Sequence, residues 1–125
     1  MILDTDVLVD LLRGHPPAIA WFGSLIAPVA VCGFAALELA QGCVNKRELK
    51  RIRKVLAPFP LVWPNAADML RAYDDYAGLP LSHGIGLLDA LIATTAVGQG
   101  LPLPTFNVRH YVAIPGLTTV QPYMR

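Results

Sequence analysis

Short apolar runs alternate along the chain with longer segments in which apolar residues recur every three or four positions. The short runs are bounded by residues that end or interrupt structure, which is typical of buried strands. They predict strands near residues 1–3, 29–32, 61–63, 101–105 and 119–121. The longer segments predict helices near residues 5–12, 16–22, 34–41, 45–56, 65–76 and 87–97. Because strands that alternate with helices form parallel sheets, the sequence predicts an α/β fold, with a parallel sheet of four to five short strands and helices on both faces.

The composition favours one folded domain over residues 1–125. Hydrophobic residues make up 54% of the chain and charged residues only 15%, and this balance argues against intrinsic disorder. The longest apolar stretch, residues 25–40, is interrupted by Pro28 and Gly33, so it does not predict a membrane span. The first residues lack the basic segment of a secretory signal. We therefore expect a compact cytoplasmic protein.

The formal net charge of +1 conceals an uneven distribution of charge. Six of the ten basic residues fall between Lys46 and Lys54, and the rest of the chain holds four basic and eight acidic residues. On the predicted helix these basic side chains lie opposite an apolar face. Two interpretations are open: the solvated outer face of an amphipathic helix, or a surface that contacts the phosphates of a nucleic acid.

Three carboxylates stand in otherwise apolar segments. Asp4 follows the first predicted strand, and open α/β sheets bind ligands at that edge. Glu38 and Asp89 each lie in a predicted helix with apolar neighbours on nearly every side. Singly, these acids are explained as a helix cap, an outward-pointing residue and a first-turn acid. Together they favour one site for Mg²⁺ or Mn²⁺, because a buried carboxylate is costly unless it is paired or binds a metal, and these cations prefer oxygen ligands.

Four motifs in register make the chain resemble the PIN domain family, and within it the VapC toxins of toxin–antitoxin pairs. They are Ile-Leu-Asp-Thr-Asp-Val-Leu-Val-Asp-Leu-Leu-Arg-Gly over residues 2–14, Leu-Glu-Leu-Ala-Gln-Gly over 37–42, Leu-Asp-Ala-Leu-Ile-Ala over 88–93, and Thr-Phe-Asn-Val-Arg-His-Tyr over 105–111. A closing Ile-Pro-Gly-Leu follows at 114–117. The resemblance implies a single PIN-like domain that hydrolyses RNA phosphodiester bonds as a metal-dependent endoribonuclease toxin.

The resemblance also implies which residues do the chemistry. It places the catalytic metal ligands for Mg²⁺, or alternatively Mn²⁺, at Asp4, Glu38 and Asp89. A fourth catalytic position, often aspartate in the family, corresponds here to Asn107. The neutral amide lowers the negative charge of the site, so it argues against a tightly held second metal.

Further residues and partners are implied around this centre. The residues expected to orient the carboxylates or a water are Thr5, Asp6 and Thr105. The candidates for binding RNA are Arg13, Lys46, Lys50, Arg51 and Arg109. The implied partners are an RNA substrate, a small VapB-like antitoxin that inhibits the toxin, and a second copy of the chain in a homodimer.

A second departure from the family pattern is the sequence Leu-Pro-Leu-Pro at residues 101–104, where the family has an ordinary apolar strand. Proline removes a hydrogen bond from a sheet and is disfavoured inside strands. We therefore expect the strand before Thr105 to be shortened or distorted.

Two alternative functions fit parts of the sequence. Asp4 and Asp6 imitate the nucleophile motif of haloacid-dehalogenase-like phosphatases, and Asp74-Asp75 imitates the later acidic pair of that family. Leu8 and the short chain argue against this alternative. The other is a catalytically silent PIN-like module that binds RNA or a partner protein, which the neutral Asn107 would permit.

Overall fold

The computed structural model describes residues 1–79 and 84–125, and it contains five short strands. The strands are β1 (Ile2–Leu3), β2 (Ala30–Cys32), β3 (Leu61–Val62), β4 (Leu103–Pro104) and β5 (Thr119–Val120). Helices occupy the segments between them: α1 (Thr5–Leu12), α2 (Pro16–Gly23), α3 (Gly33–Gln41), α4 (Lys46–Leu56), α5 (Ala66–Arg71), the π-helical turn η1 (Ala72–Tyr76), α7 (Leu87–Gln99) and α8 (Val108–Tyr111). This arrangement is the α/β fold that the sequence predicts.

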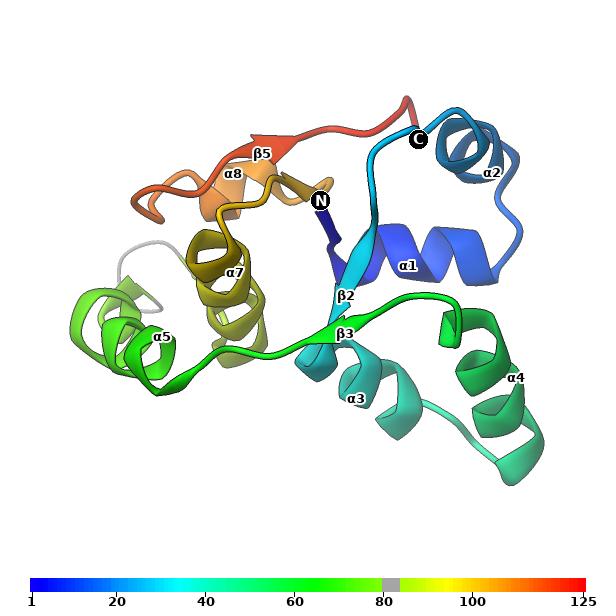
Figure 1. The fold of residues 1–125 in the computed structure, drawn as a ribbon, viewed down its shortest axis with the longest axis horizontal. Helices are drawn as coiled ribbons and strands as arrows, with labels where there is room; N and C mark the ends of the chain where they lie inside the picture. The colour runs from blue at the N-terminus through cyan, green and yellow to red at the C-terminus, as the bar shows by residue number, and fades with distance from the viewer. Residues whose placement is uncertain (80–83) are drawn as a thin grey trace.

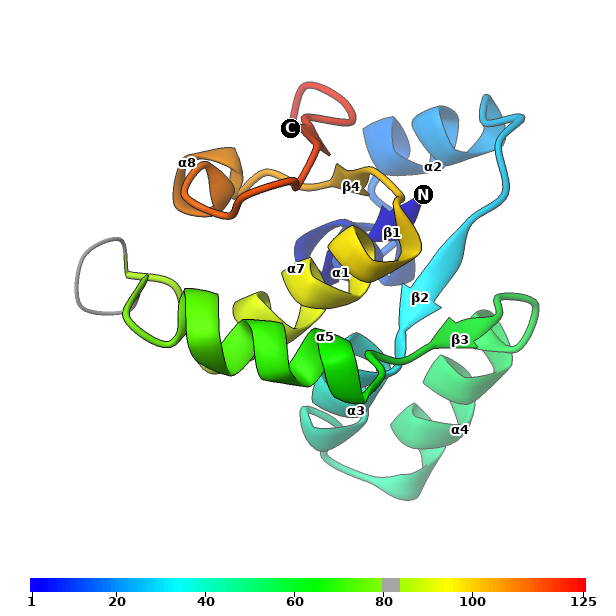
Figure 2. The same cartoon turned by 60° about the vertical axis from the view of Figure 1, so that its left-hand side comes forward.

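The strands form two parallel ladders that meet side by side. One has the order β1-β2-β3 and the other pairs β4 with β5. The Ile2 N–H donates to the Pro102 carbonyl at 3.0 Å. The Asp4 N–H likewise donates to the Pro104 carbonyl at 3.2 Å. Because the residue numbers of donor and acceptor both increase by two, β1 and β4 run parallel, and they lie side by side in Figure 2. The spatial order is therefore β3-β2-β1-β4-β5.

The prolines explain why the two ladders join so weakly. Pro102, just before β4, and Pro104, within it, are the positions whose carbonyls face β1, and proline has no N–H to return a hydrogen bond. The intervening N–H groups face β5, where Leu103 donates to Thr118 at 2.8 Å. Consequently the N–H groups of residues 2 and 4 donate hydrogen bonds to this segment, and the prolines donate none in return. The strand β4 is two residues long, which confirms the shortened strand.

The helices cover both sides of the strands. Figure 1 shows α1 and α2 on one side of the β1–β2 pair and α7 with α5 on the other. The chain runs outward from β1 through β2 to β3, and then returns through α5 and α7 to β4, next to β1. This reversal makes the carboxyl ends of β1 and β4 the switch point of the sheet, which is where open α/β folds bind ligands.

The core lies between the strands and the two helices that flank β1. All residues of β1 and β2 are buried, as are Val7 and Leu8 of α1 and Ile92 and Ala93 of α7. Within the described residues, no helix is both long enough and apolar enough to cross a membrane. The cytoplasmic location stays a prediction.

Three details differ from the predicted elements. The helix expected over residues 65–76 changes from α to π geometry at Ala72, and a short helix, α8, forms where none was predicted. The helix expected to end at Val97 continues through Gly98 to Gln99. Position 98 of α7 requires a residue without a Cβ, because the carboxylate of Asp68 occupies the space that a Cβ atom would need. The stop comes at Gly100, whose φ of +65° suits a residue without a Cβ.

Candidate functional site

Asp4 lies at the switch point, directly after β1. Its backbone is extended, and its Oδ1 atom accepts a hydrogen bond of 2.8 Å from the Thr5 N–H, which caps α1. The side chain is nevertheless almost fully buried, with 4% of its surface exposed. The capping role and a place in a functional site, which were alternatives in the sequence, are thus both compatible with this residue.

Residues from the other half of the chain complete the surroundings of Asp4. The buried Thr105 hydroxyl, one residue beyond β4, donates to Asp4 Oδ2 at 2.7 Å. The buried Tyr111 hydroxyl on α8 lies 3.4 Å from Asp4 Oδ1. These contacts join segments about a hundred residues apart, so the site exists only in the folded chain.

Asp6 ties the turn after β4 to the first turn of α1. Its Oδ1 accepts from the Val7 N–H at 2.7 Å, and its Oδ2 accepts from the Phe106 N–H at 2.9 Å. The Asn107 N–H donates to Thr105 Oγ1 at 2.9 Å, so the hydroxyl that holds Asp4 also fixes Asn107. The turn formed by residues 105–107, called here the 105–107 turn, is therefore anchored to both aspartates.

Burial and mutual repulsion both act on these carboxylates. The pKa of Asp4 is raised to about 6, and burial is the largest cause of the rise. The negative charges of Asp6 and Asp89 also raise this pKa, while hydrogen bonds from Thr105 and Thr5 lower it. Burial likewise raises the pKa of Asp6 above its ordinary value, although hydrogen bonds from the Phe106 and Val7 N–H groups oppose the rise. The charges of Asp6 and Asp89 therefore act on Asp4, and we call these three aspartates the acidic cluster.

Tyr111 belongs to the same electrostatic environment. Burial raises the pKa of its hydroxyl, and the charges of Asp4 and Asp89 raise it further. The phenol is therefore a neutral hydrogen-bond donor to the acidic cluster at every physiological pH. Tyr111 closes the fourth motif of the sequence, but the sequence did not reveal its role, because the short helix that turns it inward was not predicted.

The two remaining predicted ligands, Asp89 of this cluster and Glu38, lie on α7 and α3. Asp89 is half-buried in the first turn of α7 and acts on the pKa of both Asp4 and Tyr111. Glu38 on α3 is exposed, so the burial that the apolar neighbours suggested is wrong for this residue. Its side chain faces outward because α3 packs its other residues, such as Ala35 and Leu39, against the core.

Glu38 lines a pocket of about 450 Å³, and basic side chains are among the other residues that line it. Thr5 and Glu38 line this pocket together with Arg13 and Arg51, and Arg51 donates a hydrogen bond to the Leu12 carbonyl. The Thr5 hydroxyl is buried without a hydrogen-bond partner in the described part of the chain. Glu48 also lines the pocket, which thus holds two arginines, two carboxylates and the Thr5 hydroxyl, and we call it the Arg13/Arg51 pocket.

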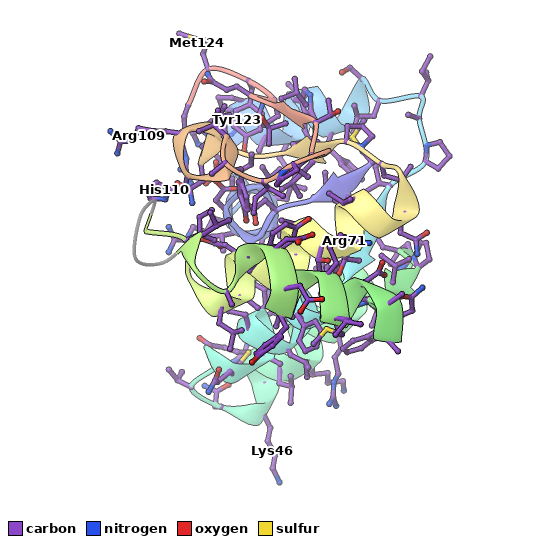
Figure 3. All side chains as sticks on the ribbon, turned by 90° about the vertical axis from the view of Figure 1, so that its left-hand side faces the viewer. Lys46, Arg71, Arg109, His110, Tyr123 and Met124 are labelled. Atoms are coloured by element: carbon purple, nitrogen blue, oxygen red, sulfur yellow. The ribbon has the colours of Figure 1, made fainter. Side chains whose placement is uncertain are left out.

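The other predicted RNA contacts are spread more widely. Lys50 is exposed on α4, and Arg109 is exposed on α8, two residues beyond Asn107. Lys46 is the first residue of α4, and Figure 3 shows it at the opposite end of the molecule from Arg109. Of the basic candidates, therefore, Arg13 and Arg51 share a pocket with Glu38, while Lys46 projects away from the body.

The donors present have the right chemistry for a hard divalent cation, since all are carboxylate, amide or hydroxyl oxygens. A cation would also offset the repulsion that raises the pKa of Asp4. Within residues 1–79 and 84–125, however, no three Asp, Glu, His or Cys side chains are grouped so that they could hold a metal ion. The donor chemistry therefore fits such an ion, although Glu38 is exposed and the three predicted ligands are not grouped around one point in this part of the chain.

The acidic pair expected for a phosphatase lies elsewhere. Asp74 and Asp75 are exposed on η1. They lie in a helical turn rather than at the end of a strand, and neither contributes to the pKa of Asp4. Nothing in the described structure therefore favours the phosphatase alternative.

Comparisons with known proteins bear on the whole chain and its fold. The model of the PIN domain family matches residues 1–113. Ribonuclease VapC10 of Mycobacterium tuberculosis is 35% identical over 120 residues, which cover 89% of this chain and 85% of that protein. A toxin–antitoxin complex from Klebsiella pneumoniae contains a chain with a TM-score of 0.78 and 26% identity, covering 99% of this chain and 98% of that one. DNA-bound VapBC from Salmonella typhimurium has a TM-score of 0.80 at 20% identity over 95% of both chains, a likeness of fold.

Proposed function

Because the chain belongs to the PIN domain family, we propose that it is a metal-dependent endoribonuclease, the toxin of a type II toxin–antitoxin system. The observation that carries the proposal is the acidic cluster at the switch point of the sheet. Asp4 is buried there beside Asp6 and Asp89, with a hydroxyl donor next to each of its two oxygens and a pKa raised to about 6. Carboxylates with raised pKa values at a ligand-binding edge are typical of catalytic sites.

In this proposal Asp4, Glu38 and Asp89 hold Mg²⁺, or alternatively Mn²⁺. When bound, such an ion lowers the pKa of a water and offsets the charge that develops on the phosphate. Asp4 requires no movement to serve as a ligand, since Thr105 and the Thr5 N–H already fix its carboxylate. Glu38 is exposed and free to turn, and Asp89 stands at the first turn of the adjoining helix.

The surrounding residues orient the carboxylates and the substrate. Thr105 holds the carboxylate of Asp4, and Asp6 holds the turn that carries Asn107. Asn107 then presents its amide at the edge of the cluster, where it supports the scissile phosphate or a water. The unpaired Thr5 hydroxyl is a second group able to bind that water.

RNA must approach an acidic centre, and the flanking basic residues offset its repulsion. Arg13 and Arg51 line the pocket that contains Glu38, so they bind the phosphates nearest to the cleaved bond. Arg109 extends this positive charge on the side of Asn107, and Lys50 and Lys46 extend it along α4. Such phosphate contacts position the RNA and carry no base specificity.

The toxin requires an inhibitor and, in this proposal, forms a homodimer. The structural neighbours from Klebsiella and Salmonella are toxin–antitoxin assemblies, which supports a small VapB-like antitoxin as the partner of this chain. Such an antitoxin covers apolar surface and places a basic side chain in the acidic cluster. The described surface offers an apolar groove of about 340 Å³ between α3, α4 and β3, which includes Trp63 and Leu61.

The test is RNA cleavage by the antitoxin-free protein. A pool of tRNA and ribosomal RNA is incubated with Mg²⁺, with Mn²⁺ and with EDTA. We expect cleavage with either metal and none with EDTA, and we expect Asp4→Asn and Asp89→Asn to lower the rate by about 10²-fold or more, since each removes a metal ligand. Asp75→Asn is the matched control, because it removes an exposed carboxylate on η1 and should leave the rate unchanged.

Full activity of Asp4→Asn would contradict the assignment of the site. RNA binding without cleavage under any of the metal conditions, with Mn²⁺ binding confirmed by calorimetry, would favour the silent module instead. Trapping of a phosphorylated Asp4 would restore the phosphatase alternative.

A further inference from the structure

The segment that holds Tyr123 and Arg125 packs against α1 and the 105–107 turn. Arg125 forms two hydrogen bonds with the carboxylate of Asp10 on α1, from Nε to Oδ2 and from Nη2 to Oδ1, each of 3.1 Å. The Tyr123 hydroxyl donates to the same Oδ2 at 2.7 Å. Asp10 is 7% exposed, so three charge-assisted hydrogen bonds meet on one buried carboxylate.

The electrostatics of Asp10 show how firmly this contact is held. Burial alone raises the pKa of that carboxyl, but the hydrogen bonds from Arg125 and Tyr123 and the charge of Arg125 outweigh burial and leave the pKa below its ordinary value. The same contact raises the pKa of the Arg125 guanidinium. The ionised pair is thus the favoured state, and it fixes the segment 123–125 to the second half of α1.

The same two side chains also enclose Phe106, the middle residue of the 105–107 turn. The guanidinium carbon of Arg125 lies 4.7 Å from the centre of the Phe106 ring, and the Tyr123 ring meets it edge to face at 4.8 Å. The N–H of Phe106 is the donor that holds Asp6 at 2.9 Å. A continuous chain of contacts therefore runs from Asp10 through Arg125 and Phe106 to Asp6.

From these contacts we infer that Arg125 and Tyr123 are positioning residues for the nuclease reaction. They clamp Phe106 against α1, and the clamp fixes the 105–107 turn, which carries Thr105 and Asn107 to the acidic cluster. The positive charge of Arg125 also acts on Asp6, whose pKa it lowers against the effect of burial. The catalytic consequence rests on the proposed function, whereas the effect on the turn does not.

The chain offers a matched control for this clamp. Arg71 pairs with Asp68 at 2.8 Å, and Asp68, like Asp10, is a buried carboxylate held by a partly exposed arginine. The Arg71 pair joins α5 to α7 and contacts no residue of the 105–107 turn. If ion pairs of this type act only on stability, Arg125→Gln and Arg71→Gln should behave alike.

The first measurement is amide hydrogen exchange by NMR on the full-length protein in EDTA, which requires no activity. In Arg125→Gln we expect the amides of Phe106 and Asn107 to exchange about tenfold faster or more, because their hydrogen bonds open locally. In Arg71→Gln these two amides should keep their protection. Unchanged protection of Phe106 in folded Arg125→Gln would overturn the inference.

The second measurement is steady-state cleavage of one RNA at a temperature at which all variants are folded. We expect Arg125→Gln to lower kcat about tenfold or more with KM within about twofold, since small displacements of positioning groups are costly to rate rather than to binding. Arg71→Gln should keep the wild-type kcat. A rise in KM alone, or an equal loss of kcat in both variants, would overturn the inference.

A milder variant keeps the test decisive if Arg125→Gln does not fold. Tyr123→Phe removes one hydrogen bond to Asp10 and leaves the ring packed on Phe106. We expect faster exchange at Phe106 than in wild type, and full protection there would equally count against the clamp. An inactive wild-type protein with the expected exchange pattern would refute the proposed function while the positioning of the turn stands.

Discussion

At the scale of single residues, the site depends on a carboxylate that is held in an unfavourable charged state. Asp4 combines nearly complete burial with two acidic neighbours, and neutral donors from Thr5, Thr105 and Tyr111 offset part of that cost. Asp10 is buried to a similar degree, but its arginine partner reverses the direction of its pKa shift. Asp4 thus lacks the cationic partner that Asp10 has, and this is one reason to propose metal binding at Asp4 and a structural contact at Asp10.

Stability without metal should therefore depend on pH through Asp4. Its pKa is about 6 in the folded chain and near 3.8 in the unfolded one, so the unfolded state loses the proton first as pH rises. Between pH 4 and pH 6.5 this carboxyl should lower the free energy of unfolding by about 2 kcal/mol, out of about 3 kcal/mol over its whole titration. Asp4→Asn removes this loss, so its stability relative to wild type should increase across that range.

Urea unfolding in EDTA at half-unit pH steps measures this difference. Subtracting the two curves cancels the opposite contribution of Asp10, whose lowered pKa acts on both proteins alike. Saturating Mg²⁺ should reduce the difference, because a bound cation stabilises the ionised form. A difference between variant and wild type that stays constant from pH 4 to pH 7 would show that Asp4 titrates normally.

At the scale of elements, close packing of α5 against α7 explains a glycine that sequence alone treats as a helix end. A Cβ on Gly98 would overlap the Asp68 carboxylate. That carboxylate cannot move freely, because it accepts from the Asn65 N–H and pairs with Arg71. Gly98→Ala should therefore destabilise the protein by about 1–3 kcal/mol, although alanine is favoured over glycine in helices by about 1 kcal/mol.

Gly23→Ala provides the comparison for that substitution. Gly23 ends α2, and a Cβ there meets no atom within 4 Å. We expect this variant to be neutral or slightly stabilised in thermal unfolding. Equal effects of the two substitutions would mean that helix propensity, rather than the contact with Asp68, decides the stability of α7.

How much of the molecule was predictable also follows from its elements. The alternation of apolar runs and amphipathic segments indicates the α/β class, and the prolines at 102 and 104 explain the short β4, because both effects are local. The resemblance of the motifs to those of the family predicts that Asp4 and Asp89 lie in one site. The sequence left open whether Glu38 is buried or points outward, and it did not predict the contacts of Arg125, since each depends on which face of a helix meets a distant segment.

At the scale of the whole molecule, charge separates into an acidic centre and basic margins. The cationic helix α4 supplies most of the basic residues, but its side chains differ in position. Arg51 enters the Arg13/Arg51 pocket, whereas Lys46 extends away from the body (Figure 3). We therefore propose that the phosphate contact applies to Arg51 and the solvated face to Lys46, while both interpretations of this helix stay predictions.

Salt dependence of RNA binding distinguishes these residues. The Asp89→Asn protein, which we expect to be inactive, is used as the background. Its affinity for a single-stranded RNA is measured by fluorescence anisotropy between 50 and 200 mM salt. Over this range of salt concentration, phosphate contacts dominate the affinity. Adding Arg13→Gln and Arg51→Gln should weaken binding and reduce the slope of log K against log salt by about 0.7 for each phosphate that is no longer neutralised. Lys46→Gln should leave the slope unchanged. If Lys46→Gln flattens the slope as much as the pocket substitutions do, RNA lies along the outer face of α4, and the pocket is not the principal phosphate site.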